Sequence, residues 1–350
     1  MDLIHKFLNL VAPPFTFFSL CFLLPPYYLY KACATALRYL TSEDVSGKVV
    51  LITGASSGIG EHLAYEYASR GACLSLVARR EVGLRDVAEV ALELGSPKVI
   101  SIVADVQNVD DCRRIVDETV NQFGGRLDHL VNNAGISSVC NFEDVADITS
   151  FRTIMDTNFW GSVYMTQFAI PHLARSYGKI IAMASAASWL PEAKMSFYNA
   201  SKAAVVSFFE TLRVELAHAV SVLIVTPGYI ESELTKGKFM TSEGRMEVDQ
   251  ELRDVKVGAV PVASVRSTAS AIVKSACRGD KYLTVPAWYR TTWLWKIFCP
   301  DAVELAYRLF FTSPPGGPET AAPSKRVLEM TGAQRLLYPE SIQNPNIKRE

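Results

Sequence analysis

Short apolar runs alternate with longer segments of helical period from about residue 45 to residue 286. Seven runs are typical of buried strands: KVVLITG from Lys48, CLSLVARR from Cys73, KVISIVADV from Lys98, LDHLVNNAG from Leu127, GKIIAMAS from Gly178, VSVLIVTPG from Val220 and KYLTVP from Lys281. Nearly all-apolar strands that are separated by helices are typical of a parallel sheet covered on both faces. The pattern therefore predicts an α/β fold with a doubly wound parallel sheet.

Glycines mark the turn after the first of these strands. The segment TGASSGIG places Gly54, Gly58 and Gly60 between that strand and a helical segment. Glycines permit a tight turn and let backbone amides approach a pyrophosphate, and the helix N-terminus adds a favourable dipole. The turn predicts a Rossmann-type dinucleotide site.

Two arginines end the second predicted strand. A site that prefers NAD usually places an acid here to bond the ribose 2′-hydroxyl, whereas this chain has Arg79 and Arg80, followed by Glu81. A guanidinium suits a 2′-phosphate through charge-assisted hydrogen bonds. The pair favours NADP(H) over NAD(H), and the alternative is two solvated surface arginines.

A tyrosine and a lysine share one face of a predicted helix. Tyr198 and Lys202 lie four residues apart in YNASK. A phenol ionises near pH ~10, and a nearby ammonium lowers that pKa, so the pair is a candidate general acid/base unit. Ser185 ends the fifth strand, where its hydroxyl can hold a substrate oxygen, and Asn158 can hold a water that relays protons to Lys202.

Composition argues against several other classes of function and site. The net charge is −1, so no nucleic-acid partner is expected. The seven cysteines form no CxxC pair and the five histidines show no ligand spacing, so no metal site or disulfide framework is expected. His129 lies inside an apolar strand, where we expect a structural role.

The N-terminal region, residues 1–44, has a different pattern. PPFTFFSLCFLLPP spans residues 13–26, and only ten residues lie between its proline pairs. A membrane-spanning helix needs ~20 apolar residues, and proline breaks or kinks helices. Lys6 precedes the segment and Lys31 and Arg38 follow it, which suits two ends on the cytoplasmic side. We expect a hairpin anchor, with a kinked single span and a signal peptide as alternatives.

The region after the last predicted strand divides into two parts. Residues 287–312 are apolar and include Trp288, Trp293 and Trp295, which suit a lipid interface; a cover over the substrate cleft and a subunit contact in a homo-oligomer are alternatives. Residues 313–350 are rich in proline, glycine and charge and are expected to be loosely ordered. The predicted domains are therefore an anchor (1–44), a dinucleotide-binding domain (45–286), an apolar extension (287–312) and a polar tail (313–350).

Together these motifs resemble those of the short-chain dehydrogenase/reductase family. The resemblance covers about Lys48 to Pro286 and rests on TGASSGIG, ADV, NNAG, TN, Ser185, YNASK and PGYIES. Within the family, the chain is similar to the 11β-hydroxysteroid dehydrogenase-like branch. With its proline-bracketed N-terminus it resembles the steroleosins of plant seed oil bodies.

The resemblance implies roles for individual residues. Tyr198 would transfer the proton, Lys202 would hold the nicotinamide ribose and tune Tyr198, Ser185 would bind the substrate oxygen and Asn158 would complete a proton relay. The cofactor would contact Gly54, Ser56, Ser57, Gly58, Ile59, Gly60, Arg79, Arg80, Asp105, Val106, Asn132, Ala134, Gly135, Pro227, Gly228, Ile230 and Ser232. Ser232 stands where the family often has threonine, which keeps the hydroxyl.

The expected function is an NADP-dependent oxidoreductase that interconverts a hydroxyl and a ketone on a lipophilic substrate, a sterol or steroid by resemblance. The expected location is the monolayer of an oil body, or lipid droplet, with the catalytic domain facing the cytosol. The endoplasmic reticulum membrane is the alternative location. A structural or sterol-binding coat protein with little turnover is the alternative function, and the full set of Asn158, Ser185, Tyr198 and Lys202 argues against it.

Overall fold

A computed structural model describes residues 2–313 and 318–343 of the chain. It divides into two compact units, of which one ends at Asp44 and the other begins at Val45.

The second unit is built on a parallel sheet of seven strands in the order β3-β2-β1-β4-β5-β6-β9. The strands are β1 (Val49–Thr53), β2 (Cys73–Ala78), β3 (Val99–Val103), β4 (His129–Asn132), β5 (Lys179–Met183), β6 (Ser221–Pro227) and β9 (Tyr282–Val285). The strand order reverses between β1 and β4, which is where ligands bind in such sheets. The predicted Rossmann-type fold is confirmed.

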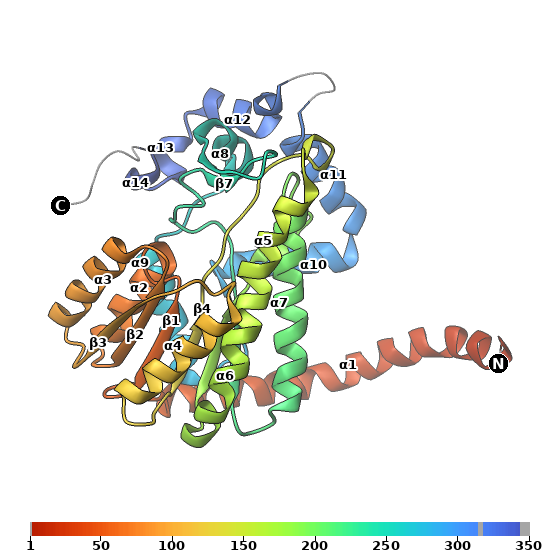
Figure 1. Ribbon diagram of the computed structural model, residues 1–350. Coiled ribbons are helices and arrows are strands. Elements are labelled where there is room, and N and C mark those ends of the chain that lie inside the picture. Colours follow the sequence, from red (N-terminus) through yellow and green to blue (C-terminus); the bar gives the residue numbers. More distant parts are fainter. Residues whose placement is uncertain (1, 314–317, 344–350) are drawn as a thin grey trace. The chain divides into compact units, whose positions relative to one another are not determined.

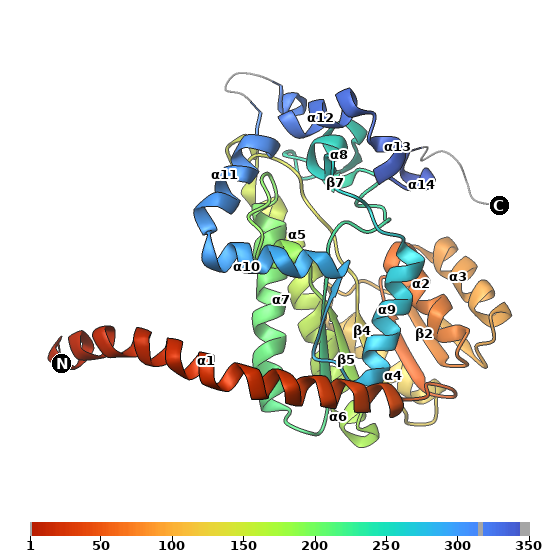
Figure 2. The same cartoon turned by 180° about the vertical axis from the view of Figure 1, so that it is seen from behind.

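Helices cover both faces of this sheet (Figure 1 and Figure 2). One face carries α2 (Gly58–Ala68), α3 (Glu81–Glu93) and α9 (Val265–Arg278), and the other carries α4 (Val109–Gln122), α6 (Gly161–Ser176) and α7 (Ser196–Glu215). The described hydrophobic residues of β1 alternate between two covered faces, which is why the strand is almost entirely apolar. Val50 and Ile52 pack on the first face, and Val49 and Leu51 pack on the second.

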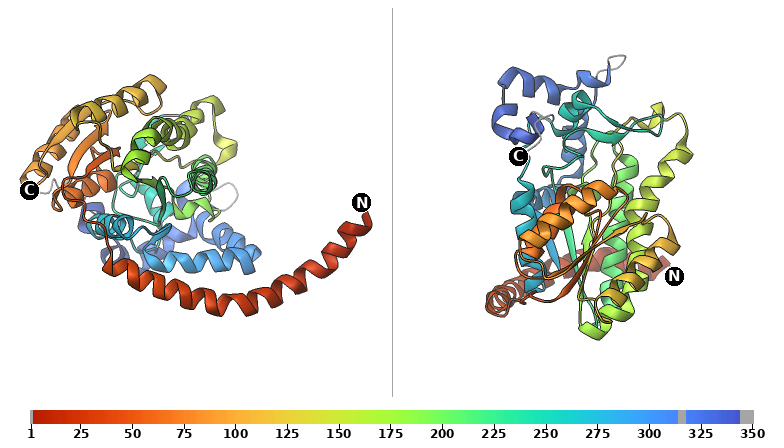
Figure 3. Two further views of the ribbon diagram at one scale, coloured as in Figure 1. Left: turned by 90° about the horizontal axis from the view of Figure 1, so that it is seen from below. Right: turned by 60° about the vertical axis from the view of Figure 1, so that its left-hand side comes forward.

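The remaining elements are short, and several gather at one end of the sheet (Figure 1; Figure 3, right). They are α5 (Arg152–Met155), the antiparallel pair β7 (Lys238–Met240) and β8 (Met246–Val248), α8 (Gln250–Val257), α10 (Arg290–Phe298), α11 (Pro300–Phe311), α12 (Pro323–Thr331), α13 (Gln334–Leu337) and α14 (Glu340–Gln343). We call α8 together with α12, α13 and α14 the cap.

The prediction of a loosely ordered tail is wrong for the described part of residues 313–350. The cap has its own apolar cluster of Val257, Val262, Leu328, Tyr338 and Ile342. The buried Arg253 of α8 donates to the carbonyl oxygen of Ile342 at 3.0 Å. The Tyr338 hydroxyl donates to the carbonyl oxygen of Gly258 at 2.9 Å. Apolar packing and hydrogen bonds therefore tie the tail to α8. Residues 314–317 and 344–350 lie outside the described part.

The first unit contains one continuous helix, α1 (Asp2–Leu40), which curves gently (Figure 3, left). The predicted hairpin is wrong, because both proline pairs lie inside this helix. Each proline removes one hydrogen bond and can bend a helix without ending it. The residues beside the pairs are Ala12, Phe15, Leu24 and Tyr27, and none is a glycine, asparagine or aspartate that would support a turn.

Helix α1 has no buried residue, and it is long and apolar enough to cross a membrane by length and composition. Its 39 residues extend roughly 58 Å at the usual helix rise, against ~30 Å for a hydrocarbon core. The alternative of a kinked single span therefore fits the structure better than the hairpin.

Candidate active site

A cleft of about 460 Å³ opens at the carboxyl ends of the strands. Its floor begins at the turn between β1 and α2. Gly54 has a φ of 66° in the left-handed region that favours glycine. A Cβ at Gly60 would lie only 2.3 Å from the carbonyl oxygen of Gly54. The tight turn thus directs the N-terminus of α2 into a cleft of ligand size, which fits a dinucleotide phosphate.

Most residues that the sequence predicts for the site line this cleft. They are Gly54, Ser56, Ser57, Gly58, Ile59, Arg79, Arg80, Asp105, Val106, Ala134, Gly135, Ser185, Tyr198, Lys202, Pro227 and Ser232. The sequence missed others on the same cleft: Asn133, Thr157, Glu233, Leu234, Lys238 and Met246. Asn133 is the second asparagine of NNAG, so the motif could have predicted it.

Other predicted residues lie outside the described cleft lining: Gly60, Asn132, Asn158, Gly228 and Ile230. The buried Asn132 side chain donates to Thr166 Oγ1 at 2.9 Å, so it joins β4 to α6. A Cβ at Gly228 would lie 2.1 Å from the Tyr289 ring. Asn132 and Gly228 thus pack against neighbouring elements, and cofactor contact by these five residues stays a prediction.

The two arginines of the predicted phosphate site have different partners. Arg80 donates to Ser57 Oγ at 2.6 Å and forms an ion pair with Glu233 at 2.6 Å. Arg79 lies 3.6 Å from the Asp105 carboxylate. Arg80 is therefore the arginine in direct contact with the glycine turn.

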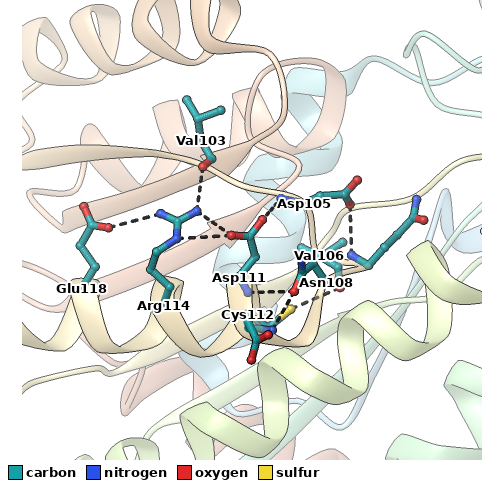
Figure 4. Close-up of polar contacts among 10 residues, drawn as sticks. Val103, Asp105, Val106, Asn108, Asp111, Cys112, Arg114 and Glu118 are labelled. Atoms are coloured by element: carbon teal, nitrogen blue, oxygen red, sulfur yellow. Dashed lines mark hydrogen bonds and ion pairs between the residues drawn. The ribbon is translucent and has the colours of Figure 1, made fainter.

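A short hydrogen-bond network holds the loop after β3, which carries Asp105 and Val106 (Figure 4). The Asp111 carboxylate accepts from the backbone amide of Asp105 at 3.0 Å and from Arg114 at 2.8 Å. These bonds, the Asp105 amide first, lower the pKa of Asp111. Cys112 Sγ donates to the carbonyl oxygen of Val106 at 3.2 Å. The loop is thus fixed at the edge of the cleft that Asp105 and Val106 line.

Asn158 lies in a π-helical turn, Asp156–Trp160, of the kind often found at functional sites. Its Nδ2 donates to the carbonyl oxygen of Ile136 at 2.9 Å and to Ser201 Oγ at 2.9 Å, and its Oδ1 accepts from the Ile136 amide at 2.8 Å. The side chain therefore ties the segment after β4 to α7. A Cβ at Gly135 would lie 3.2 Å from Asn158 Oδ1 and 3.4 Å from Lys202 Nζ, so both atoms border the same space.

Tyr198, Ser185 and Lys202 meet at the inner end of the cleft. Lys202 Nζ donates to the carbonyl oxygen of Met183 at 3.0 Å and lies 5.7 Å from the centre of the Tyr198 ring. Burial raises the pKa of Tyr198 to about 12, and its hydrogen bond with Ser185 opposes this rise. Burial lowers the pKa of Lys202 to about 8. The expected net lowering of the Tyr198 pKa is therefore wrong for this structure, because desolvation is the larger effect.

This arrangement defines the class of the protein. The family model described as short chain dehydrogenase matches residues 48–243, and the chain belongs to that family. It is an oxidoreductase whose fold binds a nicotinamide cofactor.

Plant relatives match over the full length. The chain is 58% identical to "11-beta-hydroxysteroid dehydrogenase A" of Arachis hypogaea and 57% identical to the protein of that name from Sesamum indicum, with 100% of both chains covered in each case. The predicted resemblance to the 11β-hydroxysteroid dehydrogenase-like branch is confirmed. Among solved structures, a short-chain type dehydrogenase/reductase from Mycobacterium marinum has a TM-score of 0.61 at 30% identity, covering 70% of this chain and 96% of that one.

Proposed function

We propose that the protein is an NADP(H)-dependent oxidoreductase that interconverts a hydroxyl and a ketone on a lipophilic substrate, a sterol or steroid. The observation that carries this proposal is the meeting of Tyr198, Ser185 and Lys202 at one cleft, where Tyr198 also belongs to a buried apolar cluster. That cluster contains Val139, Ala187, Met195, Tyr198, Phe239 and Leu252. The hydroxysteroid dehydrogenase names of the plant relatives support the steroid class.

The chain's own residues provide binding and proton transfer. In the reducing direction, the Tyr198 hydroxyl donates its proton to the substrate carbonyl oxygen, and in the oxidising direction it accepts the hydroxyl proton. Ser185 holds that oxygen, and Lys202 stabilises the phenolate that forms. Asn158 fixes α7 and borders the space beside Lys202, which supports its proposed place in a proton relay. A nicotinamide held in the cleft would supply the hydride to, or accept it from, the substrate carbon that carries this oxygen.

A screen with purified protein tests this function. We expect oxidation of one or more hydroxysteroids with NADP⁺, followed by the absorbance of NADPH, and a lower kcat/KM with NAD⁺. A simple alcohol such as ethanol is the control and should be a poor substrate, because it fills little of the cleft of about 460 Å³. Absence of turnover across hydroxysteroids and ketosteroids with both cofactors would favour the coat-protein alternative.

The cofactor preference rests on Arg80 more than on Arg79, because Arg80 contacts the glycine turn. We expect Arg80→Asp to weaken NADPH binding by at least about 10-fold, because a charge-assisted hydrogen bond is lost and repulsion is added. NADH binding should change much less. Titration of the protein's fluorescence with each cofactor gives both dissociation constants.

Two further variants make this test specific. Arg79→Asp should have the smaller effect on NADPH, and Arg175→Asp, at an exposed position at the end of α6, should have none. Equal weakening of NADPH and NADH in Arg80→Asp would show that Arg80 does not read the 2′-phosphate.

We propose that α1 anchors the enzyme to a lipid surface, with the oil-body monolayer as the location and the endoplasmic reticulum bilayer as the alternative. Five of the polar residues of the helix, His5, Asn9, Thr16, Lys31 and Arg38, fall at spacings of four, seven, fifteen and seven, which places these five on one side. A helix with such a stripe can lie in a monolayer with its apolar side in oil. This replaces the hairpin as the physical basis for the oil-body proposal.

A further inference from the structure

Three polar side chains that the proton transfer does not use lie together beyond Tyr198. Glu192 lies in the loop that follows Ser185, Tyr229 lies two residues after β6, and Lys256 lies near the end of α8. They border one small cavity, which Tyr307 and Phe311 of α11 also line. Segments far apart in the sequence therefore bring a carboxylate, a phenol and an ammonium to one place.

The contacts show that these groups are close and desolvated. The Tyr229 hydroxyl has two acceptors for its one proton, the carbonyl oxygen of Lys256 at 2.9 Å and Glu192 Oε2 at 3.3 Å. Burial raises the pKa of Glu192, against the attraction of Lys256. Burial also lowers the pKa of Lys256 to about 8, against the attraction of Glu192. Burying two charged groups carries a desolvation penalty that lowers the stability of the folded protein, so a functional reason for this pair is expected.

Lys256 points toward the proton-transfer residue. Its Nζ lies 5.9 Å from the centre of the Tyr198 ring and 5.2 Å from the centre of the Phe239 ring. Both rings belong to one buried apolar cluster, and Tyr198 also lines the cleft. An ammonium has three donors, and in the part of the chain that the structure describes no acceptor within hydrogen-bond distance of Nζ is seen. The unused donors lie on the side of Tyr198 that faces the small cavity.

The chemistry of the pair selects one kind of ligand. A carboxylate would be repelled by Glu192, and a carbonyl oxygen would accept from Lys256 but give nothing to Glu192. A hydroxyl can accept from Lys256 and donate to Glu192 at the same time. Resting on the function proposed above, we propose that Glu192 and Lys256, with Tyr229 holding them, form a subsite for a second hydroxyl group of the lipophilic substrate.

Binding of matched steroid probes tests this subsite without requiring turnover. The probes are pairs of steroid ketones, each pair differing only by one hydroxyl in place of hydrogen at positions around the ring system. Dissociation constants are measured with NADPH-loaded enzyme. We expect at least one pair in which the wild type binds the hydroxylated member about 10-fold more tightly or better, because a site built for a hydroxyl leaves polar groups unpaired without it.

The variants Glu192→Gln and Lys256→Met should each bring the ratio of the two dissociation constants toward one. Lys325→Met is the matched control, since Lys325 belongs to the cap and pairs with Glu251 at 3.3 Å, and it should keep the wild-type ratio. Thermal unfolding shows whether each variant is folded. If a variant does not fold, Tyr229→Phe replaces it, and it should reduce the ratio because it releases Glu192.

Two results would overturn the proposal. One is a wild type that binds no hydroxylated probe more tightly than its partner, and the other is a ratio that survives Glu192→Gln and Lys256→Met in folded protein. A purely structural role in holding α8 would weaken both probes of a pair equally and leave the ratio unchanged. Turnover of the same probes is measured separately: absence of turnover counts against the proposed function, whereas loss of the ratio alone counts only against the subsite.

Discussion

Tyr198→Phe is expected to lower kcat at least about 100-fold, the lower end of the contribution of general acid/base catalysis. The substitution keeps the buried ring, which packs with Val139 and Met195, and removes the oxygen that hydrogen-bonds with Ser185. Cofactor binding should be nearly unchanged. Steady-state kinetics with a steroid found in the screen, together with NADPH titration, measure both effects.

Tyr282→Phe is a matched control for the loss of a tyrosine hydroxyl. The Tyr282 hydroxyl donates to Glu210 at 2.7 Å at an exposed position, so its loss should leave turnover near that of the wild type. Wild-type turnover in Tyr198→Phe would remove Tyr198 from the mechanism and with it the proposed proton transfer.

Deletion of residues 2–40 is expected to release the protein from lipid surfaces while its catalytic activity is kept. The deleted helix has no buried residue, and the unit that begins at Val45 contains the whole sheet and cleft. Flotation of cell extracts measures the change: the full chain should float with the lipid fraction and the shortened chain should stay in the soluble fraction. Retention of the shortened chain on lipid would assign the anchor to another surface.

Variants of the polar stripe of α1 test which of the two proposed locations is correct. Residues 1–44 fused to a fluorescent protein should label oil bodies if the helix lies in the monolayer. Replacing Asn9, Thr16 and Lys31 by leucine removes most of the stripe and should move the label to the endoplasmic reticulum, because a uniformly apolar helix favours spanning. Substituting Leu20, Leu23 and Leu29 by isoleucine keeps the stripe and is the control. Equal oil-body labelling by all three fusions would contradict the stripe as the signal.

The sheet and the catalytic residues were predictable because their signals are local. Each buried strand is a continuous apolar run, and Tyr198 and Lys202 are four residues apart on one helix. Asn133 belongs to a motif already noticed, whereas Glu233 reaches the cleft only because the loop after β6 turns back to Arg80. No spacing in the sequence shows that contact.

The predictions that failed concern competing effects. Leu328, Tyr338 and Ile342 lie in short apolar groups within a polar stretch, so only the folded cap shows that they pack together. The prolines of α1 were treated as helix breaks, although no turn residue accompanies them. For Tyr198, the nearby ammonium of Lys202 was counted, and the larger cost of burying a phenolate was not.

The cap has a consequence for the order in which the protein is made. Helix α1 leaves the ribosome before the rest of the chain, and α12 to α14 leave it after the sheet. Val257 and Val262 cannot complete their packing until Leu328, Tyr338 and Ile342 have been synthesised. Chains fold from the N-terminal side as they emerge. If α1 binds a lipid surface as proposed, delivery to that surface can therefore begin while the cap is still unfinished.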